Sequence, residues 1–226
     1  MGIFVFLGFI LSFLMLPATN CEKVVNKEPI PWKKLINDKD IAALFVFRFS
    51  YTTCIGIIWS FMPVFADTQF SISSSNIGIL IMIGIFVSGI MHIPMGYLAD
   101  YINKKIIIIT GGVIATIAII LLERSGGFYG LILSNILFGI GGGISMPALM
   151  AISVLKGNHT ASMSSIMSML TMGHSLGMLA GAICAGLMME IFDLRYAFLL
   201  GAVIMTIGTG FLGRSLELKK IDTSFV

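Results

Sequence analysis

Residues 94–122 read PMGYLADYINKKIIIITGGVIATIAIILL. One apolar stretch ends at Ala99, a short polar segment follows, and a second apolar stretch runs from Lys105 to Leu122. A helix that crosses the hydrocarbon core of a membrane needs about 20 consecutive, mostly apolar residues. The sequence therefore predicts two membrane helices here, joined by a tight polar loop.

The same pattern extends in both directions along the 226 residues. Seven apolar stretches are interpreted as membrane helices: 1–17, 41–65, 76–99, 105–122, 128–155, 162–189 and 195–213. A signal peptide is the alternative for the first stretch, although no Lys or Arg precedes its apolar run. The predicted fold is all-α, a polytopic membrane helix bundle. It comprises a lone leading helix (1–17), a loop (18–40), a six-helix unit (41–213) and a tail (214–226).

The composition excludes several classes of protein. Hydrophobic residues make up 57% of the chain and charged residues 11%, whereas soluble domains carry about 25% charged residues. Neither a soluble enzyme nor a disordered chain has this composition. The net charge is only +3, and the basic residues lie in short loops, so no nucleic-acid partner is expected. The three cysteines are widely spaced, and no metal or cofactor is expected.

The positive charges predict an orientation in the membrane, because cytoplasmic loops are enriched in Lys and Arg. If the N-terminus lies outside, eleven of the 14 basic residues fall on the cytoplasmic side, and only Arg124 and Arg195 fall outside. Arg48 lies within a helix. The cytoplasmic residues are Lys23, Lys27, Lys33, Lys34, Lys39, Lys104, Lys105, Lys156, Arg214, Lys219 and Lys220. The expected location is a cell membrane, with the C-terminus in the cytoplasm.

The loop after residue 95 carries a recognisable motif, Gly-x-Leu-Ala-Asp-x-x-x-Lys-Lys, at residues 96–105. Further along, residues 137–148 form a glycine-rich stretch that ends in a proline, and residues 172–181 carry glycines at helical spacing. These three features together resemble the loop signature and the fourth and fifth helices of a half of the major facilitator superfamily. The stretch 162–167 resembles the start of that fifth helix in drug-efflux-like members.

The resemblance implies a fold and a function. The leading helix, the Lys-rich segment and the six helices correspond to helix six, the central loop and the C-terminal half of a twelve-helix transporter. The expected function is secondary transport of a small molecule by alternating access. The expected partners are membrane lipid, the small-molecule substrate and the missing N-terminal six-helix half. Met178 stands where the antiporter-type motif has a proline, which weakens any expectation of proton antiport.

Several polar side chains within the apolar stretches are candidates for binding the substrate. Arg48 lies roughly 10 Å from the cytoplasmic start of its helix, and its helical spacing places it on one face with Thr52, Ile55 and Trp59. Intramembrane cations usually face the interior of the protein, although snorkelling to the interface is the alternative for Arg48. The candidate substrate-binding residues are Arg48, Tyr51, Thr52, Trp59, Asn135 and His174.

The motif loop supplies four candidate gating residues by position: Gly96, Asp100, Lys104 and Lys105. Gly96 is expected to allow close helix contact, and Asp100 to interact with nearby loop cations or a helix dipole. Asn103 is a residue that tolerates the left-handed conformation, which a tight turn can need.

Three further patterns have ordinary structural interpretations. Ser88 and His92 lie one turn apart, as a packing pair or a polar site. Residues 173, 177, 181 and 185 are small and repeat every four positions, which predicts close helix packing. Met62-Pro63 and Met146-Pro147 occupy corresponding places in two helices, a weak sign of an internal repeat.

Two other classes of function remain as hypotheses. A non-transporting membrane module would pack permanently against another membrane protein. An intramembrane enzyme would need a buried pair of carboxylates or an His-x-x-x-His set, and the sequence has neither. The chain is therefore expected not to be an enzyme.

Overall fold

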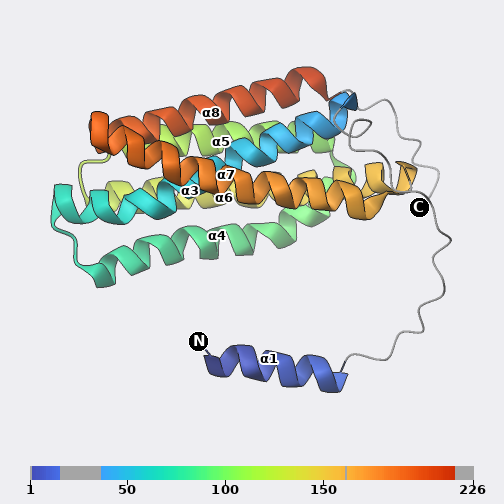
Figure 1. Ribbon diagram of the computed structural model, residues 1–226, viewed down its shortest axis with the longest axis horizontal. Helices are drawn as coiled ribbons and strands as arrows, with labels where there is room; N and C mark the ends of the chain where they lie inside the picture. The colour runs from blue at the N-terminus through green and yellow to red at the C-terminus, as the bar shows by residue number, and fades with distance from the viewer. Residues whose placement is uncertain (1, 16–36, 161, 217–226) are drawn as a thin grey trace.

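The computed structural model describes residues 2–15, 37–160 and 162–216, and this part of the chain is almost entirely helical. Figure 1 shows the long helices lying side by side in one bundle. Their bounds are α3 (Lys39–Phe70), α4 (Ser74–Tyr101), α5 (Lys104–Glu123), α6 (Phe128–Thr160), α7 (Met163–Ile191) and α8 (Leu194–Ser215). All six are long and apolar enough to cross a membrane, which confirms the predicted helical membrane bundle.

The leading helix is shorter than predicted. Helix α1 (Gly2–Met15) has 14 residues, or about 21 Å at 1.5 Å per residue, against a hydrocarbon core of about 30 Å. Its assignment as a membrane-spanning helix stays a prediction. Most of the loop 18–40 and of the tail 214–226 lies outside the described residues.

Side-chain caps mark where α3, α5 and α8 begin, with Asp193 as the cap of α8. Asp38 starts α3 by accepting hydrogen bonds from the amides of Asp40 and Ile41. Asn103 starts α5, and its side chain accepts from the amide of Lys105. Asn103 has a φ of −58°, so the left-handed conformation that this residue tolerates is not used here. The side-chain cap satisfies a backbone donor at this junction without a positive φ.

The packing contains an internal repeat. Helix α3 packs along α7 and α8, and α6 packs correspondingly along α4 and α5. The helices α3, α4 and α5 therefore correspond to α6, α7 and α8. The contact of α3 with α7 corresponds to that of α6 with α4, and the contact of α3 with α8 to that of α6 with α5. Helices α3 and α6 are the most buried, whereas α4 buries only Leu80 and Ala99. The centre of the bundle is thus formed by two equivalent helices, one from each group of three.

The predicted small-residue stripe on α7 is confirmed as a helix contact. Gly173, Gly177, Gly181 and Ala185 are all buried. A Cβ atom added at Gly177 would lie 3.1 Å from the amide nitrogen of Thr53 on α3, and closer to the carbonyl oxygen of Phe49. Small residues allow the two backbones to approach closely. In lipid the hydrophobic effect does not favour helix association, so this close packing is what holds α3 and α7 together.

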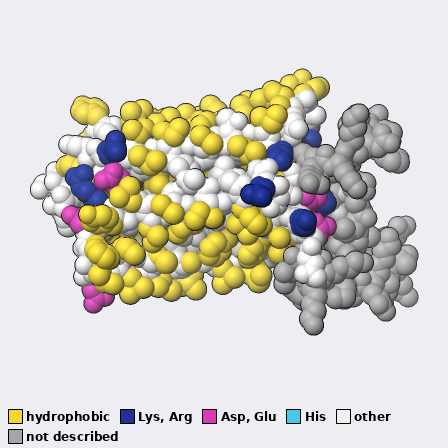
Figure 2. Space-filling view, turned by 90° about the horizontal axis from the view of Figure 1, so that it is seen from above, with side chains coloured by type: hydrophobic (Ala, Val, Ile, Leu, Met, Phe, Trp, Pro, Cys, Tyr) yellow, Lys and Arg dark blue, Asp and Glu magenta, His cyan; other side chains and the backbone are white. Residues whose placement is uncertain are grey.

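Apart from Arg48, the described charged residues lie near the two ends of the bundle. We call these the Asp100 end, where α3 begins and α8 ends, and the Asp193 end opposite it. Figure 2 shows one face of the molecule, with apolar side chains along its length and charged side chains gathered toward both ends. This distribution matches a helical bundle whose middle lies in lipid.

Helices α5 and α8 cap each other at these two ends. The Lys105 ammonium at the start of α5 donates to the carbonyl oxygen of Leu216, 2.7 Å away, at the end of α8. At the opposite end the Arg195 guanidinium, which also lies over the Phe65 ring, donates to the carbonyl oxygen of Glu123, 3.1 Å away. Each cation therefore satisfies a carbonyl at the negative end of the partner helix.

We expect Lys105→Met and Arg195→Met each to lower the stability of the bundle by about 1 kcal/mol, because each leaves a terminal carbonyl without its charged donor. Thermal unfolding of the purified protein in detergent measures this. Lys104→Met is the control, since the described part of the chain shows no side-chain hydrogen bond for Lys104. Equal melting temperatures for Lys105→Met and Lys104→Met would contradict the capping role.

Candidate functional site

A pocket of about 270 Å³ opens between α3, α4 and α6, at the middle of the bundle. Helix α3 contributes an aromatic and aliphatic wall, α4 a wall with two polar side chains, and α6 an amide beside an aromatic ring. The lining residues are Tyr51, Ile55, Ile58, Trp59, Ile81, Gly84, Ile85, Ser88, Gly89, His92, Asn135, Phe138 and Gly139. An apolar pocket with a few convergent polar groups is the usual form of a small-molecule site.

Aromatic rings form one side of the pocket. Tyr51 stacks on Phe138 with ring centroids 5.3 Å apart and an interplanar angle of 7°. The Tyr51 hydroxyl lies against Gly142, where any side chain would collide with it. Trp59 is 46% exposed and borders the opening. The rings offer a flat apolar surface that suits stacking with a planar part of a ligand.

Asn135 is the buried amide of the pocket. Its Nδ2 donates to the carbonyl oxygen of Leu131, 2.9 Å away, and to the Met62 sulfur, 3.0 Å away. Both amide hydrogens are therefore used, which leaves the amide oxygen to accept a hydrogen bond. That oxygen lies beside Gly84, which lines the pocket. Asn135 can thus recognise a donor group on a ligand.

Ser88 and His92 also line the pocket, although they were not among the candidate substrate residues. His92 Nδ1 lies 2.5 Å from the carbonyl oxygen of Ser88, one turn earlier in α4. The second ring nitrogen remains available for another partner. The polar pair was visible in the sequence, but only the packing of α4 against α6 shows that it faces Asn135 across a pocket.

The residues predicted on one face of α3 lie in two different environments, the pocket and the contact with α7. Tyr51 and Trp59 lie in the pocket, and Asn135 joins them from α6. Thr52 is fully buried against α7, and its hydroxyl donates within α3 to the carbonyl of Arg48, 2.8 Å away. Arg48 and His174 do not line the pocket. Helical spacing placed Arg48, Thr52 and Trp59 on one face of α3, but α7 covers the part of that face that carries Thr52.

Arg48 and Asn135 make reciprocal contacts between the two central helices. Arg48 Nη1 on α3 donates to the Met146 sulfur on α6, 2.6 Å away, while Asn135 on α6 donates to Met62 on α3. Each methionine directly precedes a proline inside its helix. Each methionine of the two Met-Pro pairs therefore accepts a hydrogen bond from the other central helix.

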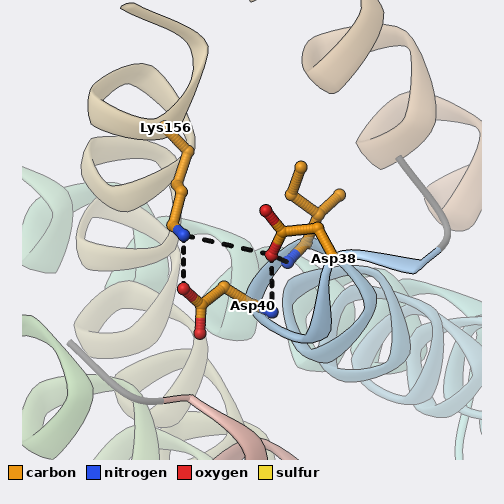
Figure 3. A network of polar contacts seen from close by, with 4 residues as sticks. Asp38, Asp40 and Lys156 are labelled. Atoms are coloured by element: carbon orange, nitrogen blue, oxygen red, sulfur yellow. Dashed lines mark hydrogen bonds and ion pairs between the residues drawn. The ribbon is translucent and has the colours of Figure 1, made fainter. Parts of the chain in front are cut away.

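An ion-pair network joins α3 and α6 at the Asp100 end. Figure 3 shows Lys156 reaching from α6 to Asp40 and Asp38 at the start of α3. Its ammonium contacts the Asp40 carboxylate closely and lies 3.9 Å from the Asp38 carboxylate. The Lys156 and Asp40 side chains are only 20% and 14% exposed. This partly buried network ties together the ends of the two central helices.

The four candidate gating residues do not form one cluster in the described bundle. Nothing there lies within 4 Å of a Cβ added at Gly96, so a close helix contact at Gly96 stays a prediction. Asp100 is exposed and forms no ion pair within the described ranges. Lys105 is engaged with Leu216, as described above. The gating role of these residues stays a prediction.

Comparison with known proteins is consistent with this architecture. The sequence profile of the Major Facilitator Superfamily matches residues 41–221. The match begins two residues into α3 and spans every later helix of the bundle. A comparison with curated protein sequences finds no match.

Proposed function

The chain belongs to the Major Facilitator Superfamily, and we propose that it supplies the C-terminal half of a secondary transporter that moves a small molecule by alternating access. The observation that supports this proposal best is the pocket between α3, α4 and α6. It lies at mid-membrane depth, it combines aromatic walls with a buried amide, and it involves both central helices of the internal repeat. Transporter binding sites occur near the midplane at such repeat interfaces.

In this proposal Tyr51, Trp59 and Asn135 contact the substrate, and Ser88 and His92 complete the polar wall. A six-helix unit offers only one side of a central cavity, so the N-terminal half is the partner that closes it. The charge bias places the Asp100 end in the cytoplasm and the Asp193 end outside, with Asp100 at the cytoplasmic gate. Efflux is the direction that the drug-efflux-like stretch 162–167 favours.

Alternating access predicts that a pocket residue is reached from both sides of the membrane. In the transporter assembled with its N-terminal half, and with all three cysteines of this chain removed, Ser88→Cys is expected to react with an impermeant maleimide in both right-side-out and inside-out vesicles of the host cell. Ser73→Cys, at the Asp193 end, is expected to react only from outside. Ile102→Cys, at the Asp100 end, is expected to react only from inside. The two end positions also test the proposed orientation.

The gate residue provides a second arm of the same experiment. Asp100→Asn is expected to change the ratio of inside to outside labelling at Ser88→Cys by at least about threefold, a shift of roughly 0.7 kcal/mol in the conformational equilibrium. Asp67→Asn, an exposed residue at the opposite end, is the control and should leave the ratio unchanged. Labelling of Ser88→Cys from one side only, in every variant, would contradict alternating access.

A non-transporting membrane module is the second candidate, because α4 presents nearly its whole length outward. In that case another membrane protein would cover α4 permanently. The DNA sequence upstream of Met1 distinguishes the two functions. Further helices with a second Gly-x-Leu-Ala-Asp loop support the transporter, whereas an in-frame stop codon followed by a ribosome-binding site favours the module.

A further inference from the structure

Arg48 is a cation in the membrane interior without an anionic partner in the described bundle. It lies nine residues into α3, roughly 14 Å from the start of the helix. None of the described ion pairs includes it. The described acidic residues all lie near helix ends: Asp38, Asp40, Asp67, Asp100, Glu123, Glu190 and Asp193. An intramembrane charge is costly, and such residues usually mark a functional site.

The hydrogen bonds of Arg48 do not compensate its charge. Its Nη1 donates to the Met146 sulfur, and a thioether is a weak, neutral acceptor. Its Nε is buried and has no acceptor within the described ranges. Snorkelling explains neither feature, because a snorkelling guanidinium would place its donors in water rather than against Met146 in the bundle.

His174 lies at the same level on the neighbouring helix. Thr52, one turn after Arg48, places its hydroxyl 3.3 Å from the carbonyl oxygen of Gly173 on α7. His174 directly follows Gly173 in α7, so it lies close to the level of Arg48 and Thr52 along the bundle. His174 Nδ1 is buried and also lacks a partner within the parts of the chain described. Both residues are only partly buried overall, although the two unpartnered nitrogens themselves are buried.

We propose that Arg48 and His174 form a subsite for an oxyanion, a carboxylate or phosphate group, on the transported molecule. This inference rests on the proposed transport function. A guanidinium binds such a group through two parallel hydrogen bonds, and the imidazole supplies a further donor. The anion supplies the charge that the helices lack. The pocket with Tyr51, Trp59 and Asn135 then receives the uncharged, planar part of the same molecule.

The subsite is tested with inorganic phosphate and acetate as probes, each exchanged for chloride at constant ionic strength. The purified chain is expected to melt at a higher temperature as either probe is added, with saturation. At about ten times the dissociation constant the rise is expected to be roughly 3–6 °C. Because this measures binding and not transport, it is independent of the labelling experiment above.

Matched variants locate the site. Arg48→Met is expected to abolish the saturable rise, and to leave the ligand-free protein at least as stable, because it removes an uncompensated charge. His174→Asn is expected to weaken the response about tenfold. Arg214→Met removes an exposed cation at the end of α8 and should respond as the unmodified protein does.

Two results would overturn the proposal. One is a saturable response to neither probe in the unmodified protein, and the other is an unchanged response in Arg48→Met. Two-sided labelling of Ser88→Cys together with either result would leave the transport function intact and reject only the anionic substrate. One-sided labelling together with an Arg48-dependent response would reject transport and retain the anion site.

Discussion

Gly181→Val is expected to destabilise the bundle by roughly 3 kcal/mol or more, the upper end of what overpacking a helix interface costs. A Cβ added at Gly181 would lie 3.1 Å from the amide nitrogen of Ile57, and closer still to the carbonyl oxygen of Thr53. These are backbone atoms of α3, so they cannot move aside by changing a rotamer. The two helices would have to separate along the contact that both share.

The measurement is the fraction of folded protein in a thermal or denaturant titration of the detergent-purified chain. Gly210→Val provides the matched control, because nothing in the described bundle lies within 4 Å of a Cβ at that position. We expect the control to melt close to the unmodified protein. If the two variants lost stability equally, the cause would be helix propensity and not the contact between α3 and α7.

Lys156→Glu is expected to cost about 3 kcal/mol, because it replaces a partly buried ion pair with a cluster of three carboxylates. The ammonium is the cation that the structure places against both Asp38 and Asp40. Removing it leaves the Asp40 carboxylate facing another negative charge with little water around it. The ends of α3 and α6 would then repel each other where they now meet.

A charge swap identifies the pair. Adding Asp40→Lys to Lys156→Glu is expected to recover about half of the lost stability, since the opposite charges meet again while a cation at the start of α3 opposes the helix dipole. Lys39→Glu makes the same charge change on an exposed neighbour and should cost under about 0.5 kcal/mol. Failure of the double variant to recover any stability would show that the pair itself contributes nothing.

The helices were predictable because membrane insertion imposes a local rule. A helix in lipid must satisfy its own backbone hydrogen bonds over about 20 apolar residues, and this requirement is readable without knowing any neighbour. The predicted starts and ends agree with α3 to α8 within a few residues. The stripe from Gly173 to Ala185 was readable for the same reason, since its spacing alone defines one face of a helix.

The candidate site was predictable only in part. Trp59 and Asn135 were recognised as polar or amphipathic groups in apolar surroundings, and the structure brings them to one pocket. Thr52 has the same signal in the sequence, yet α7 covers it. Gly96 was expected to allow a close helix contact, but a lone glycine does not show which side of its helix meets a neighbour.

The sequence by itself determined that this protein is a membrane helix bundle, where each of its long helices begins and ends, and which family it resembles. These properties depend on residues close together in the chain. Only the tertiary structure decided which side chains meet: Asn135 with Met62, Arg48 with Met146 and Lys156 with Asp40. The physical reason is that the periodicity of one helix shows which residues share a face, but not which helix packs against that face. That pairing depends on close packing between segments that are distant in the sequence.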